Sequence, residues 1–154
     1  MGKGEITVRI GFDFHGVLEK YPNVFKPLIQ LLDAIGAEVC VVSGPTLDEI
    51  DGELTKYGYN DGIASIHSVI DFLKQNNVKT WQDEKGTWWA ADEDWWSSKA
   101  KMCKENDIDI MIDDSEKYAP YFDSVKTEFI MFKDCNFKEM LTRMMAIFGV
   151  NLNE

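Results

Sequence analysis

Histidine, cysteine and basic residues are scarce in this sequence, and no long apolar run is present. The chain has 154 residues, with 2 histidines and 3 cysteines. No segment approaches the about 20 consecutive apolar residues that a helix needs to cross a bilayer. Residues 1–9 also lack the apolar stretch of a signal peptide. We therefore expect a cytoplasmic protein with no membrane partner.

The few cysteines argue against a disulfide framework or a zinc site. Cys40, Cys103 and Cys135 are odd in number, far apart and mostly set among apolar neighbours. Disulfide-rich domains and zinc sites instead place cysteines in pairs at short spacings. We expect these residues to be buried free thiols.

Positive charge is also limited. The chain has 16 Lys and Arg against 27 Asp and Glu, which gives a formal net charge of -11. Nucleic-acid binding depends largely on Lys and Arg neutralising phosphates, so this balance disfavours a nucleic-acid partner. We expect a small-molecule substrate instead.

What the chain does contain is an alternation of strand-like and helix-like segments. Apolar, β-branched runs predict strands at residues 6–14, 38–42, 63–66, 108–112 and 128–132. Apolar residues at helical spacing predict helices at 25–35, 47–54, 69–73, 98–105 and 137–148. Short links between alternating elements predict an α/β fold, a three-layer doubly wound parallel sheet. We interpret residues 1–154 as a single domain.

One segment, residues 79–96, interrupts this alternation. A turn at 83–86 between 80–82 and 87–90 predicts a small hairpin insertion, and alternation puts one of its two adjacent tryptophans on the exposed side. All five tryptophans fall in this segment, at Trp81, Trp88, Trp89, Trp95 and Trp96. They fit a lid or substrate platform, an anchor to the core, or a homo-oligomer interface, and the sequence does not choose among these.

Polar residues gather at the carboxyl ends of three of the predicted strands. They are Asp13 and His15 at the end of the first, Ser43 and Gly44 after the second, and Asp113 and Asp114 after the fourth. Ligands of open parallel α/β sheets bind outside the carboxyl ends of the strands. We therefore expect these residues to form one site.

Such a cluster of carboxylates calls for a cation. Two carboxylates about 4 Å apart repel by about 4 kcal/mol at an effective dielectric constant near 20. Oxygen ligands without histidine nitrogen or sulfur are typical of Mg²⁺. The sequence therefore predicts Mg²⁺ as the cofactor.

The same residues carry a resemblance to a known family. Residues 10–17 (IGFDFHGV) resemble the first motif of the haloacid dehalogenase-like superfamily, 41–44 (VVSG) its second and 110–114 (IMIDD) its fourth. The resemblance extends over residues 6 to about 132. It implies a magnesium-dependent phosphomonoester hydrolase that acts through an aspartyl-phosphate. The short link between the first two motifs leaves no room for a large cap domain.

The resemblance also implies roles for individual residues. Asp13 would be the nucleophile, and Asp13, the His15 carbonyl and Asp113 would hold Mg²⁺, with Asp114 as a further ligand or an acceptor beside it.

The resemblance assigns the phosphate contacts as well. Ser43 and the Gly44 amide would bind phosphate oxygens, and a lysine in the helix before the fourth motif would neutralise the transferred group. Lys99, Lys101 and Lys104 all lie in that helix. Because the N-terminus of such a helix faces the carboxyl edge of the sheet, we expect Lys99 to fill this role, with Lys101 as the alternative.

His15 departs from the family pattern, which has an acid-base aspartate at this position. A histidine can donate and accept protons near neutral pH, so we expect His15 to take over general acid-base catalysis. The alternative is a catalytically weak regulatory domain that binds phosphate and Mg²⁺. The other histidine, His67, fits a packing role better than a place at the site rim.

Overall fold

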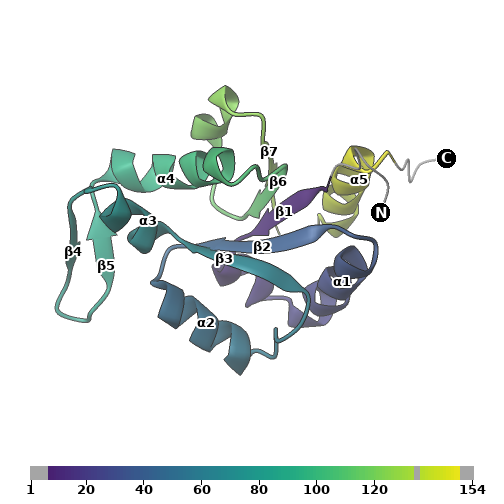
Figure 1. Ribbon diagram of the computed structural model, residues 1–154, viewed down its shortest axis with the longest axis horizontal. Coiled ribbons are helices and arrows are strands. Elements are labelled where there is room, and N and C mark those ends of the chain that lie inside the picture. The colour runs from purple at the N-terminus through teal and green to yellow at the C-terminus, as the bar shows by residue number, and fades with distance from the viewer. Residues whose placement is uncertain (1–6, 134–135, 150–154) are drawn as a thin grey trace.

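The computed structural model of the protein describes residues 7–133 and 136–149. Seven strands, five α-helices and two short helical segments alternate along the chain (Figure 1). In order they are β1 (Arg9–Phe12), η1 (Phe14–Leu18), α1 (Pro22–Ala34), β2 (Glu38–Ser43), α2 (Leu47–Lys56), β3 (Ile63–Ser68), α3 (Val69–Gln75), β4 (Thr80–Gln82), β5 (Trp88–Ala90), α4 (Asp92–Glu105), β6 (Ile110–Asp113), η2 (Ala119–Ser124), β7 (Glu128–Met131) and α5 (Phe137–Ile147).

Five strands form a parallel sheet in the order β3-β2-β1-β6-β7. The central strand β1 pairs with β2 on one side and with β6 on the other, so that Ile10 lies beside Val39 and Ile110. Strands β4 and β5 form a separate antiparallel hairpin that extends from one end of the molecule (Figure 1). The parallel α/β sheet and the hairpin insertion are thus as the sequence predicts.

Side chains alternate along each strand, so apolar residues emerge on both faces of the sheet. Helices cover both of these faces. Ile10 and Phe12 of β1 belong to a core that includes residues of α1, α2 and α5. Met111 of β6 and Val42 of β2 belong to a second core with residues of α3 and α4. These two apolar layers fix the strands so that their carboxyl ends meet at one edge.

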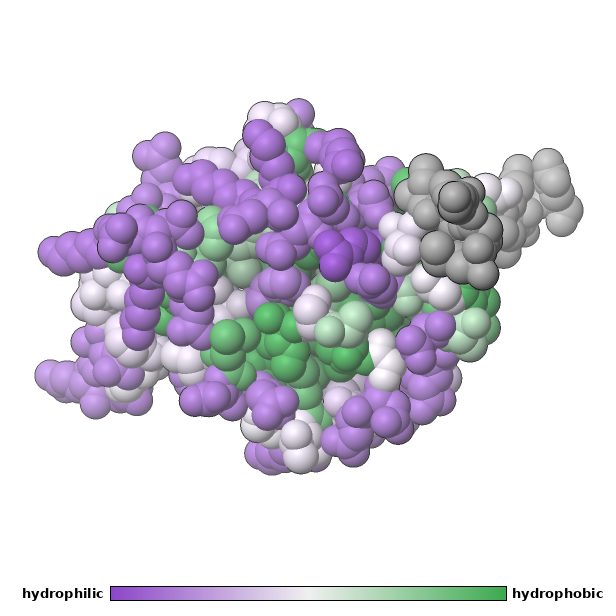
Figure 2. All heavy atoms as spheres, viewed as in Figure 1, coloured by the Kyte–Doolittle hydropathy of each residue, from purple (hydrophilic) through white to green (hydrophobic). Residues whose placement is uncertain are grey.

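Strand β3 forms one edge of the sheet and leaves apolar surface exposed. Figure 2 shows apolar side chains gathered over this strand, between areas that are mainly hydrophilic. Ile63 and Ile66 of β3 are only partly buried. The sheet is therefore less completely covered at its edge strand β3 than at its central strands.

The largest correction concerns α4, which begins at Asp92 rather than near Ser98. Asp92, Glu93 and Asp94 occupy its first turn, where negative side chains are favoured by the helix dipole. Consequently Trp95 and Trp96 belong to the helix, and only the other three tryptophans lie in the hairpin.

Smaller differences affect strand ends and the cysteines. The first strand is Arg9–Phe12, shorter than the predicted 6–14, and Ile6 lies outside the described residues. Cys40 and Cys103 are buried free thiols as predicted, whereas Cys135 lies outside the described residues. Among the helices that the structure describes, none has the length and apolarity needed to cross a bilayer.

Candidate active site

The carboxyl ends of β1, β2 and β6 bring the predicted residues to one edge of the sheet. Asp13 directly follows β1, and its backbone N–H donates to the Ile112 carbonyl of β6 at 2.9 Å. Asp113 ends β6, and Ser43 ends β2 on the opposite side of β1. The site therefore lies where the chain order reverses across the sheet, a common location of ligand sites in this architecture.

Lys99 links the carboxylates. Its Nζ lies 2.6 Å from Asp113 Oδ2 and 3.1 Å from Asp13 Oδ1, and its side chain is 1% exposed. Nζ also lies 4.4 Å from the centroid of the Tyr118 ring. Lys101, the alternative from the sequence, is exposed. Of these two lysines, Lys99 is therefore the one that contacts the carboxylates.

Burial changes the proton equilibria at this site. Burial and the neighbouring Asp113 raise the pKa of Asp13 to about 7, against the opposing effect of Lys99. For Lys99, burial lowers the pKa but the carboxylates of Asp113 and Asp13 outweigh it, so the pKa lies above its usual range. Lys99 therefore stays protonated, whereas burial favours the protonated form of Asp13 more than in an exposed aspartate.

Asp114 completes a group of three carboxylates. One oxygen each of Asp13, Asp113 and Asp114 lies within 4.8 Å of the others. Burial and Asp113 raise the pKa of Asp114. Since Lys99 supplies one positive charge against three carboxylates, the site keeps excess negative charge. This all-oxygen donor set fits a hard divalent cation.

The loop after β1 requires glycine at one position. Gly16 has a φ of +79°, and a Cβ added there would collide with the Asp114 carboxylate. Gly16 thus lets the η1 segment approach Asp114 closely. A side chain here would displace a carboxylate of the group.

Ser43 and Gly44 lie in different settings. The Ser43 hydroxyl is fully buried and has no hydrogen-bond partner in the described part of the chain. Such an unsatisfied hydroxyl costs about 1–3 kcal/mol. Gly44 lines the same cavity as Asp13, and a Cβ added to it would lie 3.0 Å from the Trp95 ring.

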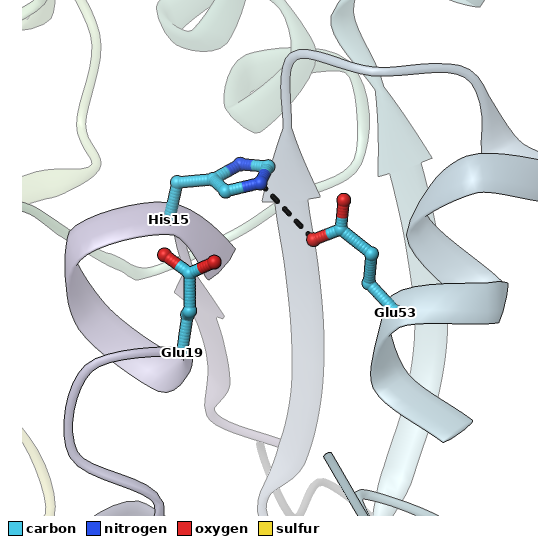
Figure 3. Close-up of side chains that lie close together, drawn as sticks. All are labelled: His15, Glu19 and Glu53. Carbon is cyan, nitrogen blue, oxygen red and sulfur yellow. Dashed lines mark ion pairs between the residues drawn. The ribbon is translucent and has the colours of Figure 1, made fainter. Parts of the chain in front are cut away.

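The His15 side chain turns toward Glu53 of α2 (Figure 3). It forms a group with Glu19 and Glu53, separate from the group of three aspartates. Its Nε2 lies 3.0 Å from Glu53 Oε2, at ion-pair distance without the alignment of a hydrogen bond. Glu19 lies close to both residues. The imidazole is 46% exposed and lines the same cavity as Asp13.

That cavity has a volume of about 750 Å³ and extends from the aspartates to the hairpin. Its walls include aromatic side chains and carboxylates. The aromatic ones are Trp88, Trp89, Trp95, Trp96 and Tyr118. The tryptophan-rich segment therefore contributes directly to the candidate site, while Ser43 and Lys99 lie outside the lining surface.

Sequence reasoning missed Tyr118 and Glu53. Tyr118 is buried, accepts a hydrogen bond from Trp95 Nε1 at 3.0 Å, and has a pKa raised by burial to about 12. Nothing in its sequence neighbourhood marks it as facing Lys99. His67 does not line the cavity and lies 2.9 Å from Ser65 Oγ, which agrees with a packing role.

Comparisons with known proteins add information on the fold alone. No family model and no curated protein matches this chain. Among solved structures, the chain is similar to the crystal structure of an uncharacterized protein from Corynebacterium glutamicum, with 13% sequence identity and a TM-score of 0.57. The similarity covers 95% of this chain and 98% of that chain. The α/β fold thus recurs over nearly the whole length of another protein.

Proposed function

We propose that the protein is a magnesium-dependent phosphomonoester hydrolase of the haloacid dehalogenase-like type, with a small-molecule substrate. The observation that carries this proposal is Lys99, buried between Asp13 and Asp113 with Asp114 beside them. A buried lysine with three carboxylates is costly as a purely structural element, because each charge loses its hydration. The arrangement is useful where a cation and a phosphate group bind together.

Asp13 is the nucleophile in this proposal. One oxygen of Asp13 attacks phosphorus, the bond from phosphorus to the substrate oxygen breaks, and an aspartyl-phosphate forms. Water then attacks that phosphorus and releases phosphate, which restores the Asp13 carboxylate. Lys99 and the Ser43 hydroxyl stabilise the charge on the phosphate oxygens during both displacements.

Asp13, Asp113 and Asp114, with the His15 carbonyl, would hold Mg²⁺, which supplies neutralising charge for the phosphate group. In its presence the ionised form of Asp13 is favoured over the protonated one. This matters because a protonated carboxyl group is a poor nucleophile.

His15 transfers the proton in this scheme. Its imidazole protonates the departing substrate oxygen and later accepts a proton from the attacking water. Glu53, 3.0 Å from Nε2, stabilises the positive charge that the ring carries before the first step and regains after the second.

A second candidate function rests on the same contact. Nε2 of His15 is directed toward Glu53 (Figure 3), and the imidazole groups with Glu19 and Glu53 rather than with the aspartates. This favours a regulatory domain that binds phosphate and Mg²⁺ with little turnover.

A direct assay distinguishes the hydrolase from the regulatory domain. Phosphate release from an aryl phosphate and a panel of small phosphomonoesters is measured with Mg²⁺ and with a chelator, for the wild type and Asp13→Asn. The hydrolase requires turnover that depends on Mg²⁺ and is lost in Asp13→Asn. Mg²⁺-dependent binding of a phosphate analogue without turnover on any substrate supports the regulatory domain instead.

A further inference from the structure

Two tryptophans on one face of the hairpin are unusually exposed. Trp81 and Trp89 are cross-strand partners, and they are 43% and 48% exposed. They differ in one respect, since Trp89 lines the cavity that contains Asp13 and Trp81 does not. An exposed indole at the rim of a cavity is a contact surface for a ligand.

Trp89 is held in place although it is exposed. Its Nε1 donates to Asp83 Oδ2 at 2.9 Å. Oδ1 of Asp83 accepts from the backbone N–H groups of Lys85 and Thr87 at 2.9 and 3.0 Å. Because the turn and the indole share this carboxylate, the ring needs little further ordering when a ligand binds.

The hairpin itself is tied to the body of the protein. Lys74 of α3 places its Nζ 3.6 Å from the centroid of the Trp88 ring. Trp88 and Trp89 are adjacent in β5, so their side chains leave opposite faces of the hairpin. The face with Trp88 therefore anchors the hairpin to α3 and also contributes to the cavity, and the other face presents Trp89.

The charge on the cavity wall further limits the chemical class of ligand that can bind. Glu49, Glu53 and Asp92 also line the cavity, and Lys85 is the lysine among its lining residues. These carboxylates repel additional phosphate groups. The wall beyond the aspartates thus suits an organic group that is flat and carries no negative charge.

We propose that Trp89 is a stacking platform that selects phosphomonoesters of flat aromatic groups, such as nucleoside monophosphates and aryl phosphates. This inference rests on the proposed hydrolase function. In it, the phosphate group lies at Asp13 and Lys99, and the aromatic group lies against the indole of Trp89. Sites that stack a base on an aromatic ring gain about 5- to 150-fold in affinity per contact.

The test compares Trp89→Ala with Trp81→Ala, its equally exposed partner outside the cavity. We measure kcat/KM with Mg²⁺ for adenosine 5′-monophosphate and for glycerol 1-phosphate. Trp89→Ala is expected to lower kcat/KM for the nucleotide at least about fivefold and to change that for glycerol 1-phosphate less than twofold. Trp81→Ala changes neither value, and Trp89→Phe restores most of the loss. Equal losses on both substrates, or no loss on the nucleotide, would overturn the inference.

A binding measurement separates this inference from the hydrolase proposal. Calorimetry with Mg²⁺ and adenosine 5′-monophosphate is done on Asp13→Asn, with and without Trp89→Ala. If the wild type hydrolyses nothing but the tryptophan substitution weakens binding at least about fivefold, the platform stands and the hydrolase fails. If turnover is normal and binding is unaffected by the substitution, the hydrolase stands and the platform is wrong.

Discussion

Replacing Lys99 with methionine gives the strongest test of the charge arrangement. The substitution keeps an unbranched apolar stem but removes the charge that lies 2.6 Å from Asp113 and 3.1 Å from Asp13. Removing one partner of a buried ion pair costs about 3–5 kcal/mol, because the remaining charge stays buried without compensation. Asp13 has a pKa of about 7 already, so it can take up a proton and keep the loss near the lower figure.

Urea denaturation at pH 7 measures this loss as a change in the free energy of unfolding. The matched control is Lys101→Met in the same helix, where the exposed lysine predicts a change within about 0.5 kcal/mol. Added Mg²⁺ should stabilise Lys99→Met more than the wild type, since the variant has a larger excess of negative charge. The reasoning is refuted if the two variants are equally stable, or if Mg²⁺ affects Lys99→Met no more than the wild type.

Three further predictions concern other parts of the site and the sheet. Gly16→Ala should weaken Mg²⁺ binding at least about tenfold and destabilise the fold by about 1–2 kcal/mol through its left-handed backbone alone, as measured by calorimetric titration and urea denaturation. His15→Ala should reduce kcat by about 10²–10⁴-fold, and Glu53→Gln by a smaller factor; unchanged turnover in His15→Ala would exclude its acid-base role. Burial and the charge of Arg9 lower the pKa of His67, so the unfolded chain binds its proton first as the pH falls. The free energy of unfolding of the wild type should therefore decrease relative to that of His67→Asn as the pH falls below about 6.5. Above that pH the difference between the two proteins should stay constant, as followed by urea denaturation.

The central sheet and the aspartates were predictable because local sequence dictates them. Asp13 and Asp113 each end an apolar run that is buried on both faces, and parallel pairing of neighbouring strands then brings the two carboxylates together. The choice of Lys99 over Lys101 followed from the direction of a crossover helix alone. These inferences need only the alternation of elements, which the sequence shows clearly.

Other features depend on how distant segments pack, which a periodic pattern does not encode. The contact of His15 with Glu53 joins the loop after β1 to α2, and the rotation of α2 about its axis decides it. The start of α4 at Asp92 is marked by its acidic first turn, but the five neighbouring tryptophans favour a longer hairpin segment that would include Trp95 and Trp96. Tertiary packing thus determines the His15 contact, whereas the start of α4 follows from a local signal.

In the proposed mechanism, the charges at the site couple substrate binding to the cation. Three carboxylates and one lysine leave the group of Asp13, Asp113, Asp114 and Lys99 with a net charge of about -2 when all are ionised. A phosphomonoester dianion that approaches this group meets repulsion, and the proton that Asp13 takes up near pH 7 relieves it only by removing the nucleophile. A divalent cation removes the repulsion without that loss. Phosphate binding should therefore be weak in chelator and strengthen with Mg²⁺, and the strengthening should be greater above pH 7, where Asp13 is ionised, than below it.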